Sequence, residues 1–561
     1  MYAGLDCYTN PIRPTRKPTV CRQTRTMIFR GPFPDVEIPD IAVTPFVLER
    51  AQSLGDKPAL IEGISGRVTS YAQLADAISR VAASLDRRGF KKGDVFGILS
   101  PNVSEYAIAF HAVAALGGIA CTINPLYTED EIAHQLKDSG ARFLVTVPTC
   151  LEKANAAAMR TGVEELFVFD TFAPSDSTVG AGGGATPFSS LLESDGKFTE
   201  AVIDPHEDLV ALPYSSGTTG LPKGVMLTHH NLVANMCQME GLTYFCEDDT
   251  LIAVLPMFHI YGLTVIMNMG LRQGATIVIL PRFDLELFLQ TLQKYEVTLA
   301  HLVPPIVLAL SKHPVVDQYP LPKLKTIFSG AAPLDENLTR ACMDRLGCEV
   351  RQGYGMTETS PVTHSSPPDP EQVKFGSVGI AAPNTECKIV DLETGTMLGP
   401  NQEGEVCVRG PQIMKGYLNS PEATAATIDA DGWLHTGDIG YADADGHFFI
   451  VDRAKELIKY KGFQVPPAEL EAVLLTHPAV ADAAVIPCPD DEAGEVPKAF
   501  VVLRGEATPE EIIQYVNGRV APHKKLRFLE SIGQIPKSPS GKILRRVLVQ
   551  AERERKQAHG A

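Results

Sequence analysis

The strongest chemical signal in the sequence is a run of glycine and hydroxyl residues that ends in one lysine, Tyr214–Gly224 (YSSGTTGLPKG). Glycines let a backbone approach a phosphate chain closely, hydroxyls donate hydrogen bonds to it, and a lysine supplies positive charge. The order differs from the GxxxxGK[ST] phosphate loop, because Lys223 follows Leu-Pro and precedes a glycine. A flexible polar turn needs only one or two of these residue types, so the run predicts a loop that binds the phosphates of a nucleotide. Its predicted contacts are Ser215, Ser216, Gly217, Thr218, Thr219 and Lys223.

Six further motifs follow this loop along the chain. They are Gln352–Glu358 (QGYGMTE), Gly404–Gly410 (GEVCVRG), Gly432–Asp438 (GWLHTGD), Val451–Arg453 (VDR), Lys459–Gln464 (KYKGFQ) and Pro536–Lys542 (PKSPSGK). In type and order, the loop and these motifs closely resemble the acyl-adenylate-forming (AMP-binding) superfamily of acyl-CoA synthetases, firefly luciferase and peptide-synthetase adenylation domains. The resemblance extends from about Phe33 along nearly the whole chain. It is greatest to the 4-coumarate–CoA ligases, whose GEICIRG box GEVCVRG nearly reproduces.

Two acidic residues in these motifs are suited to hold the rest of a nucleotide. Asp438 follows a glycine at an expected transition from strand to loop, where a carboxylate can accept both hydroxyls of a ribose. Glu358 offers a hard oxygen ligand beside the phosphates, which suits Mg²⁺. The resemblance implies the same two roles. It also implies nucleotide contacts through Gln352, Tyr354, Thr357, Arg453 and Lys542.

Lys542 lies in a Ser-Pro-Ser-Gly-Lys segment, where we expect an exposed turn carrying one cation. Attack on the α-phosphate of ATP builds negative charge, which a lysine at that phosphate would stabilise. A loop lysine taken alone is usually just solvated, but the resemblance makes Lys542 the catalytic residue of adenylation and places His259 beside the acid. The implied reaction converts acid and ATP to acyl-AMP and pyrophosphate, and then acyl-AMP and CoA to acyl-CoA and AMP.

The resemblance also outlines a pocket for the acid. Gly353 stands where acetate-activating relatives carry a tryptophan, so we expect a deep pocket for aryl, cinnamate-like or medium-chain acids. Met257–Gly262 holds no aspartate to anchor an α-amino group, and no carrier domain follows Lys542, so CoA is the expected thiol. The residues expected around the acid and its adenylate are His259, Tyr261, Val265, Ala331, Gln352, Gly353, Thr357, Pro361, Val362, Lys455, Lys459 and Gln464. Those expected to contact CoA are Arg282, Lys461 and Gly462.

Three positions depart from the 4-coumarate–CoA ligase pattern: Val265 replaces a serine, Ser365 a methionine and Arg282 a lysine. The less polar residue at position 265 leaves open whether a ring hydroxyl is recognised, and one buried polar contact can change a preference by orders of magnitude. We therefore predict 4-coumarate- or cinnamate-type aryl acids as substrates, with medium- or long-chain fatty acids as the alternative. Cys407, in GEVCVRG, is interpreted as a packing residue.

A second class of function, a nucleotide-binding relative without catalysis, is disfavoured. Such a protein would be expected to lack one of the residues that the chemistry needs. Lys542, Asp438 and Glu358 are all present.

Composition limits which other classes of protein this chain can belong to. The 561 residues carry a net charge of −17, which disfavours sequence-independent binding to nucleic acid. The 11 cysteines form no CxxC pair, which indicates reduced thiols and a cytoplasmic protein. No stretch reaches the roughly 20 apolar residues of a membrane span. A monomer or weak dimer is expected.

The elements that must position these residues alternate between strand and helix. Ser70 is expected to cap a helix with Gln73 in the capping-box position, Val95–Leu99 is a buried strand, and a further helix follows from Ser104. Such units predict an α/β fold, with a large multi-layer N-terminal domain of parallel sheets covered by helices. After Asp452 the pattern becomes a small, mobile α+β C-terminal domain.

The expected domain organisation has four parts. Residues 1–30 are basic and proline-containing, which suggests a disordered leader, with a transit peptide or a start at Met27 as alternatives. Residues 31–451 form the large domain that binds ATP and the acyl group, 452–453 the hinge, and 454–561 the small domain with the catalytic lysine. Residues 174–187, rich in glycine and serine, are expected to form a surface loop.

Overall fold

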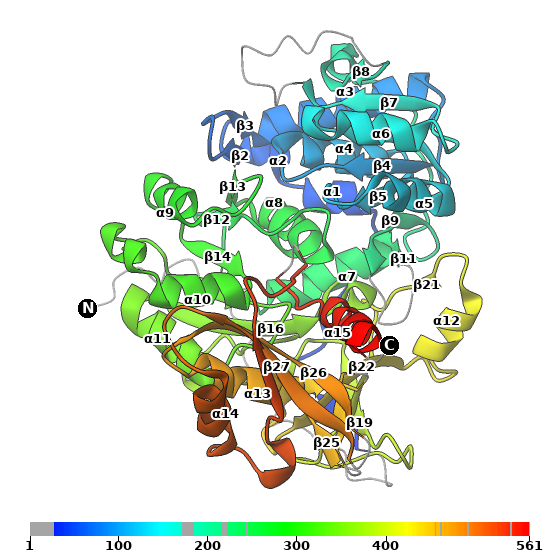
Figure 1. Cartoon of the computed structure of the whole chain (residues 1–561). Helices are drawn as coiled ribbons and strands as arrows, with labels where there is room; N and C mark the ends of the chain where they lie inside the picture. Colours follow the sequence, from blue (N-terminus) through cyan, green and yellow to red (C-terminus); the bar gives the residue numbers. More distant parts are fainter. Residues whose placement is uncertain are drawn as a thin grey trace.

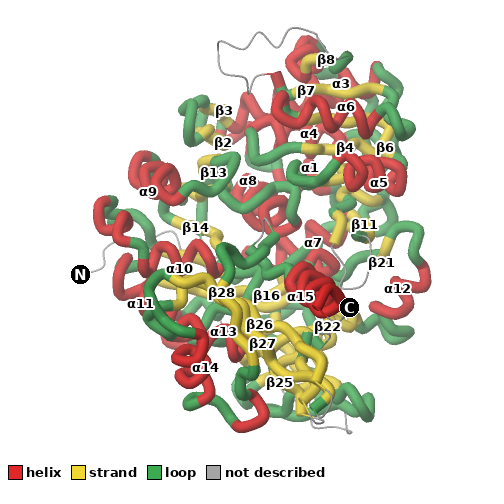
Figure 2. The backbone as a smooth tube through the Cα atoms, viewed as in Figure 1, coloured by secondary structure: helices red, strands yellow, loops and turns green. Residues whose placement is uncertain are grey.

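Two large sheets and one small sheet organise the chain (Figure 2). The computed structural model describes residues 27–170, 184–215, 222–242, 245–454, 456–460, 463–490, 493–538 and 541–559. The predicted leader up to residue 26, and most of the glycine-rich segment 174–187, lie outside these residues.

The largest sheet changes character at its middle. Within the described residues it has 14 strands, parallel from β16 to β2 and antiparallel from β17 to β1. Its order is β1 (Phe29–Arg30), β19 (Glu386–Val390), β20 (Gly404–Arg409), β22 (Leu434–Ala442), β23 (His447–Arg453), β18 (Gly379–Ala381), β17 (Val362–Ser365), β16 (Glu349–Gly355), β15 (Thr326–Ser329), β14 (Leu299–Leu302), β12 (Thr250–Ala253), β13 (Thr276–Ile279), β2 (Pro58–Glu62) and β3 (Val68–Ser70). The QGYGMTE motif therefore lies where the sheet changes direction.

The second sheet is mainly parallel and carries the lysine of the phosphate loop at one end. Its order is β10 (Tyr214–Ser215), β11 (Lys223–Thr228), β9 (Leu209–Ala211), β5 (Ile119–Ile123), β4 (Val95–Leu99), β6 (Ala141–Thr146), β7 (Glu165–Val168) and β8 (Thr186–Pro187), with β21 (Gly416–Tyr417) also paired to β11. All five residues of β4 are buried, as expected for a strand with helices on both faces. Figure 1 shows helices α3, α4 and α6 around these strands.

The helices begin and end at recognisable residues. Ser70 accepts a hydrogen bond from the backbone of Gln73, whose side chain accepts one from Ser70 N–H, so the predicted capping box is confirmed. The α-helices of the described residues are α1 (Val43–Val47), α2 (Ala51–Leu54), α3 (Tyr71–Arg87), α4 (Ser104–Ala115), α5 (Glu129–Ser139), α6 (Leu151–Ala158), α7 (His229–Glu240), α8 (Met269–Gln273), α9 (Leu285–Lys294), α10 (Pro304–Lys312), α11 (Glu336–Leu346), α12 (Pro421–Thr427), α13 (Pro467–Leu475), α14 (Pro509–Asn517) and α15 (Arg545–His559). None of them has the length and hydropathy to cross a membrane.

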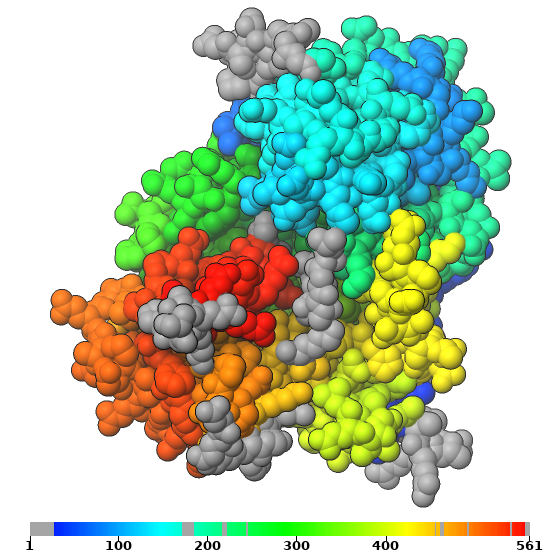
Figure 3. Space-filling model, turned by 45° about the vertical axis from the view of Figure 1, so that its right-hand side comes forward, coloured from blue at the N-terminus to red at the C-terminus, as the bar shows by residue number. Residues whose placement is uncertain are grey.

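The C-terminal segment forms a sheet of its own. Its strands are β25 (Phe463–Val465), β24 (Ile458–Tyr460), β27 (Gly494–Leu503) and β26 (Val480–Asp490), with β28 (Phe528–Ser531) paired to β27. It has a separate core, which includes Leu470, Val485 and Val501. In Figure 3 this orange-to-red unit lies beside the green and yellow parts of the chain. The predicted hinge at 452–453 coincides with the end of β23, the last strand of the large sheet.

A buried ion network anchors α15 next to that strand end. Arg545 Nη2 donates to both carboxylate oxygens of Glu471, at 2.8 and 2.7 Å, and Arg545 also pairs with Glu456. Asp452 Oδ2 accepts from Ala468 N–H at 2.9 Å, at the start of α13. Buried carboxylates need such partners, because an unpaired charge in this position costs several kcal/mol.

Candidate active site

The ribose-binding aspartate of the sequence analysis lies in a buried cluster of three side chains. Asp438 and Arg453 face each other across β22 and β23, and Arg453 Nε lies 3.2 Å from Asp438 Oδ1. Tyr354, on β16 of the same sheet, donates from Oη to Asp438 Oδ2 at 2.6 Å. Burial raises the pKa of the Asp438 carboxyl, whereas Arg453 and Tyr354 oppose that shift. Each of the two carboxylate oxygens of Asp438 therefore has a protein partner that fixes its orientation.

Asp438 does not lie at a transition from strand to loop, as the sequence suggested. It lies inside β22, where that strand falls out of register with β20. The regular ladder of backbone hydrogen bonds is interrupted there. Gly437 has a φ of +68°, and the Thr436 hydroxyl donates to Val406 O at 2.6 Å. A strand that continues past the irregularity is more rigid than a loop, so the carboxylate is held from both ends.

The described part of the phosphate loop converges with the predicted magnesium ligand. Ser215 and Lys223 are paired across β10 and β11, and Lys223 Nζ lies 5.4 Å from the ring centre of Tyr417. Tyr417 Oη donates to Glu358 Oε1 at 2.8 Å. Ser216, Gly217, Thr218 and Thr219 lie outside the described residues.

Glu358 fits a magnesium ligand by its chemistry and position. Its carboxylate is buried close to the lysine end of the phosphate loop, and only one of its two oxygens has Tyr417 as a donor. Mg²⁺ commonly binds to one or two carboxylates together with waters and substrate phosphates. Glu358 could therefore hold the ion, which would neutralise phosphate charge when it is bound with ATP.

The loop of the predicted catalytic lysine rests against the large sheet. A side-chain carbon at Gly541, whose φ is +77°, would lie 3.1 Å from Val303 Cγ2 and 3.4 Å from Pro305, so glycine permits this approach. Lys542 is half-buried, not on an exposed turn as predicted. Burial, together with Arg453 and Arg545, lowers the pKa of Lys542 to about 8.

The charge of Lys542 affects the pKa of two other predicted site residues, His259 and Asp438. Burial, with a smaller contribution from the charge of Lys542, lowers the pKa of His259 to about 4, and Lys542 also favours the ionised form of Asp438. His259 is therefore neutral near pH 7. Its Nδ1 accepts from Tyr261 N–H at 3.4 Å, which leaves Nε2 to carry the proton. The structure thus brings Lys542, His259 and Asp438 together.

A cavity of ≈ 90 Å³ begins at His259. One water needs about 10–15 Å³ by the same measure, so the cavity has room for several heavy atoms. The sequence named eight of its lining residues: His259, Tyr261, Val265, Ala331, Gly353, Tyr354, Pro361 and Val362. Tyr261 and Val265 come from a π-helix, Tyr261–Asn268, a form that is often found at functional sites.

The cavity is also lined by residues that the sequence analysis missed. His301, on β14, shares a hydrogen bond of 3.2 Å between its Nδ1 and Tyr261 Oη. Its other ring nitrogen, Nε2, is buried without a protein partner. Burial lowers the pKa of His301 to about 3, so the ring is neutral. A single histidine in an apolar strand pattern (LAHL) gave no signal beyond a satisfied core residue. The other missed residues are mostly apolar: Met239, Leu242, Phe245, Ile260, Met269, Phe328, Gly330, Gly355 and Met356. Ser365, which the sequence analysis named only as a departure from the ligase pattern, also lines the cavity.

Gln352 and Thr357 flank this cavity without lining it. Both polar ends of the Gln352 amide contact the backbone of Leu334, at 3.3 and 3.1 Å, so Gln352 fixes the loop that carries Ala331. Ala331 itself has φ of +70°. Thr357 begins the short turn Thr357–Thr359, directly before Pro361 and Val362. Direct contacts of Gln352 and Thr357 with a ligand stay predictions.

The remaining predicted residues lie apart or outside the described part of the chain. Arg282 is exposed before α9, and Lys459 is exposed on β24, where it pairs in register with Gln464. Lys455, Lys461 and Gly462 are outside the described residues. The CoA contacts and the roles of Lys455, Lys459 and Gln464 therefore stay predictions.

Comparison with known proteins identifies the family. The model of the AMP-binding enzyme family matches residues 47–418, and that of the AMP-binding enzyme C-terminal domain matches residues 469–542. The chain belongs to the AMP-binding enzyme family. This membership confirms the predicted superfamily and fold class. It also confirms the enzyme class, an AMP-forming acid–thiol ligase, and the use of ATP and Mg²⁺ with CoA as a substrate.

Individual members of the AMP-binding enzyme family match over nearly the full length. The chain is 46% identical to 4-coumarate–CoA ligase 1 of Petroselinum crispum over 533 residues, which cover 93% of this chain and 96% of the relative. It is 46% identical to 4-coumarate–CoA ligase of Pinus taeda, over 93% and 97% of the two chains. Among solved structures, an anthranilate CoA ligase in complex with anthranoyl-AMP superposes with a TM-score of 0.84 at 26% identity, covering 94% and 99%. ATP-bound MatB from Rhodopseudomonas palustris gives 0.81 at 29%, covering 91% and 99%.

The lowered pKa of Lys542 predicts how adenylation depends on pH. Lys542 is cationic below about pH 8 and loses its charge above it, so kcat/KM for ATP–pyrophosphate exchange should fall about tenfold per pH unit once pH exceeds 8. His259 is already neutral above about pH 4 and adds no step near pH 7. The measurement is exchange of labelled pyrophosphate into ATP from about pH 6 to about pH 10.

Lys542→Arg is the control for this profile, because arginine keeps its charge throughout that range. Its exchange rate should be flat where that of the wild type falls. A wild-type rate that stays constant to pH 10 would show that the charge of Lys542 does not limit adenylation.

Proposed function

We propose that this protein is an ATP-dependent CoA ligase for 4-coumarate- and cinnamate-type aryl acids. The observation that carries the proposal is one largely apolar cavity whose lining includes His259 and the polar pair formed by Tyr261 and His301. Apolar walls with a few polar groups suit an acid that carries an aromatic ring. The 46% identity to 4-coumarate–CoA ligases supports the same substrate class.

In the first half-reaction, a carboxylate oxygen of the acid attacks the α-phosphorus of ATP and pyrophosphate leaves. We assign to Lys542 the stabilisation of the charge that develops on that phosphate, and to neutral His259 the orientation of the carboxylate. Asp438 accepts hydrogen bonds from the ribose hydroxyls, and Arg453 and Tyr354 fix the position of its carboxylate. Glu358 holds Mg²⁺, and Lys223 contacts the outer phosphates.

The second half-reaction follows from the chemistry of the product. A carboxylate is a poor acceptor for a thiol because its leaving group would be oxide, whereas AMP leaves readily from the acyl-adenylate. The thiolate of CoA attacks the acyl carbon and AMP departs. We propose that the unit after residue 453 moves about the hinge between the two steps, which would bring Lys461 and Gly462 toward CoA in place of Lys542. The change of sheet between β23 and β24 supports this position for the hinge.

A panel of acids tests the substrate assignment. Initial rates of acyl-CoA formation, measured with ATP and Mg²⁺, should give the highest kcat/KM for 4-coumarate, cinnamate or their ring-substituted relatives. A higher value for octanoate or a longer fatty acid would replace this proposal with the fatty acyl-CoA ligase. Pyrophosphate release with none of the acids would favour the non-catalytic relative.

His301 should contribute to recognition of the ring. Its Nε2 is buried without a protein partner at the cavity wall, so a ring hydroxyl is a fitting hydrogen-bond partner. His301→Leu should lower kcat/KM for 4-coumarate relative to cinnamate by about tenfold, the effect of one hydrogen bond of roughly 1.4 kcal/mol. Phe328→Leu, which changes the wall without changing its polarity, is the control and should affect both acids alike. An unchanged ratio in His301→Leu would mean that the ring hydroxyl lies elsewhere.

Lys542 should separate the two half-reactions. Lys542→Ala should lower adenylate formation by at least about 100-fold, since it removes the cation at the α-phosphate. Thioester formation from a supplied acyl-adenylate and CoA should stay within a few-fold of the wild-type rate. Rapid-quench measurements of each half-reaction provide the test, and equal losses in both would contradict the division of roles.

The location and assembly of the protein rest on composition. Reduced cysteines and an acidic surface favour the cytoplasm, and a monomer or weak dimer is expected. Size-exclusion chromatography with light scattering would measure the oligomeric state.

A further inference from the structure

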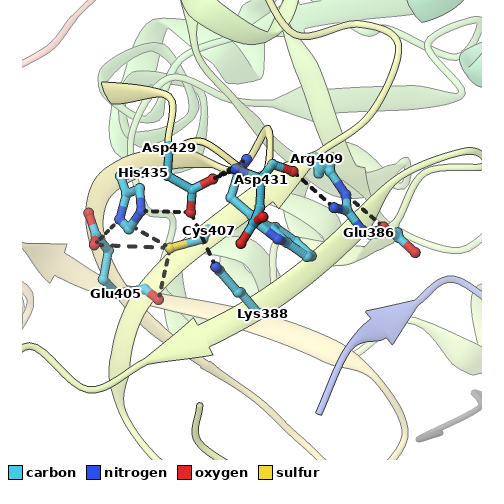
Figure 4. A network of polar contacts seen from close by, with 9 residues as sticks. Glu386, Lys388, Glu405, Cys407, Arg409, Asp429, Asp431 and His435 are labelled. Carbon is cyan, nitrogen blue, oxygen red and sulfur yellow. Dashed lines mark hydrogen bonds and ion pairs between the residues drawn. The ribbon is translucent and has the colours of Figure 1, made fainter. Parts of the chain in front are cut away.

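A thiol, an imidazole and a carboxylate meet on one face of the large sheet, away from the acid cavity. Glu405 and Cys407 are two residues apart on β20, so their side chains project to the same face. His435 on β22 is the register partner of Cys407 and therefore projects beside it. Figure 4 shows the three side chains pointing toward one another.

The three candidate ligand atoms lie within 4.8 Å of one another, and two of them form a hydrogen bond in the absence of an ion. His435 Nδ1 lies 2.8 Å from Glu405 Oε2 and 3.5 Å from Cys407 Sγ, and Sγ lies 4.0 Å from the same carboxylate oxygen. Ligands around a tetrahedral zinc ion, at about 2.0–2.3 Å from the metal, are separated from one another by about 3.4–3.6 Å. Shifts of a few tenths of an ångström would bring each of the three atoms to those positions.

The other nitrogen of His435 already has the environment of a metal ligand. His435 Nε2 lies 3.6 Å from Asp429 Oδ2, so the second ring nitrogen faces a carboxylate. Histidines that bind metals generally direct their second nitrogen toward a carboxylate or carbonyl, which fixes the tautomer and ring orientation. Lys388 Nζ is 3.6 Å from the same Asp429 oxygen and lies over the Trp433 ring, so that cation is engaged with other groups.

We propose that Glu405, Cys407 and His435 form a site for a divalent transition-metal ion, with Zn²⁺ as the ion that the ligands suit best. Thiolate and imidazole ligands favour zinc over Mg²⁺. With a thiolate and a carboxylate the occupied site is electrically neutral, which suits its half-buried position. His435 is 32% exposed and Glu405 15%, so an ion can enter and a water can complete the tetrahedron. The metal displaces the thiol proton on binding, as in other zinc–cysteine sites.

The site connects to the nucleotide through Glu405. Its second oxygen, Oε1, accepts from Gly437 N–H at 3.0 Å, directly before Asp438. An ion bound through Oε2 leaves that hydrogen bond intact and links β20 to β22 at the register irregularity. This site is independent of which acid the enzyme uses.

Metal binding to the full-length protein tests the proposal. Metal-free protein should take up one equivalent of Zn²⁺ in competition with a chromophoric chelator, and Cys407→Ser and His435→Gln should each weaken binding at least tenfold. With Co²⁺ as the probe, the wild type should show a thiolate-to-metal charge-transfer band that Cys407→Ser lacks. Cys387→Ser is the matched control, since Cys387 is a buried strand cysteine 3.4 Å from His364 Nε2. It should retain both signals.

Two results would overturn the proposal. One is the lack of a cobalt–thiolate band in the wild type, and the other is a band of equal intensity in Cys407→Ser and His435→Gln. Zinc uptake at the exposed group Asp40, His206 and His230, which also lie within ligand distance of one another, gives no such band because that group has no sulfur. If Cys407→Ser unfolds, the half-exposed His435→Gln alone decides the outcome.

Discussion

The arrangement of several strands in the large sheet depends on one buried carboxylate, that of Asp438, which needs partners for its charge. Asp438 is buried between Arg453 and Tyr354, and an ionised carboxyl is tolerated there because Arg453 forms an ion pair with it and Tyr354 donates a hydrogen bond to it. These partners come from β23 and β16, so satisfying one charge fixes three strands relative to one another. The same constraint places the end of β23, the last strand before the small C-terminal sheet, next to Asp438.

Burial and the charges around that cluster set the protonation states of Lys542 and His259, the two residues to which we assign roles in adenylation. Burial of Lys542, in a region that also contains Arg453 and Arg545, lowers the pKa of its ammonium to about 8. His259, beside it, is held neutral. A cation and a neutral imidazole at the same site can serve different oxygens of the substrates, one on phosphorus and one on carbon. The buried pair of Arg545 with Glu471 holds the helix that follows Lys542.

Much of the fold and site could be predicted from the sequence, because the motifs are contiguous in the chain. The capping box at Ser70, the buried strand Val95–Leu99 and the helix from Ser104 depend on neighbours within a few residues, and all three are confirmed. The family and the enzyme class are confirmed for the same reason.

What depends on contacts between distant residues could not be predicted. The half-buried state of Lys542 comes from packing of its loop on Val303 and Pro305, more than 200 positions away, which no local pattern reveals. His301 resembled an ordinary core histidine because Tyr261, its partner, is on another element. Cys407 was interpreted as packing, since its neighbours His435 and Glu405 meet only when β20 and β22 pair. Asp438 was placed at a strand end because register irregularities are a property of two strands.

The irregular register of β20 and β22 restricts how this region can change in evolution. Between the pairs Glu405–Ile439 and Cys407–His435, β22 carries two more residues than β20. Deleting one of residues 436–438 would turn every later side chain of β22 to the opposite face of the sheet, and Asp438 would leave its partners. Side chains in this part of β22 can therefore be exchanged, whereas its number of residues is fixed. Divergence by insertion and deletion must occur elsewhere in the chain.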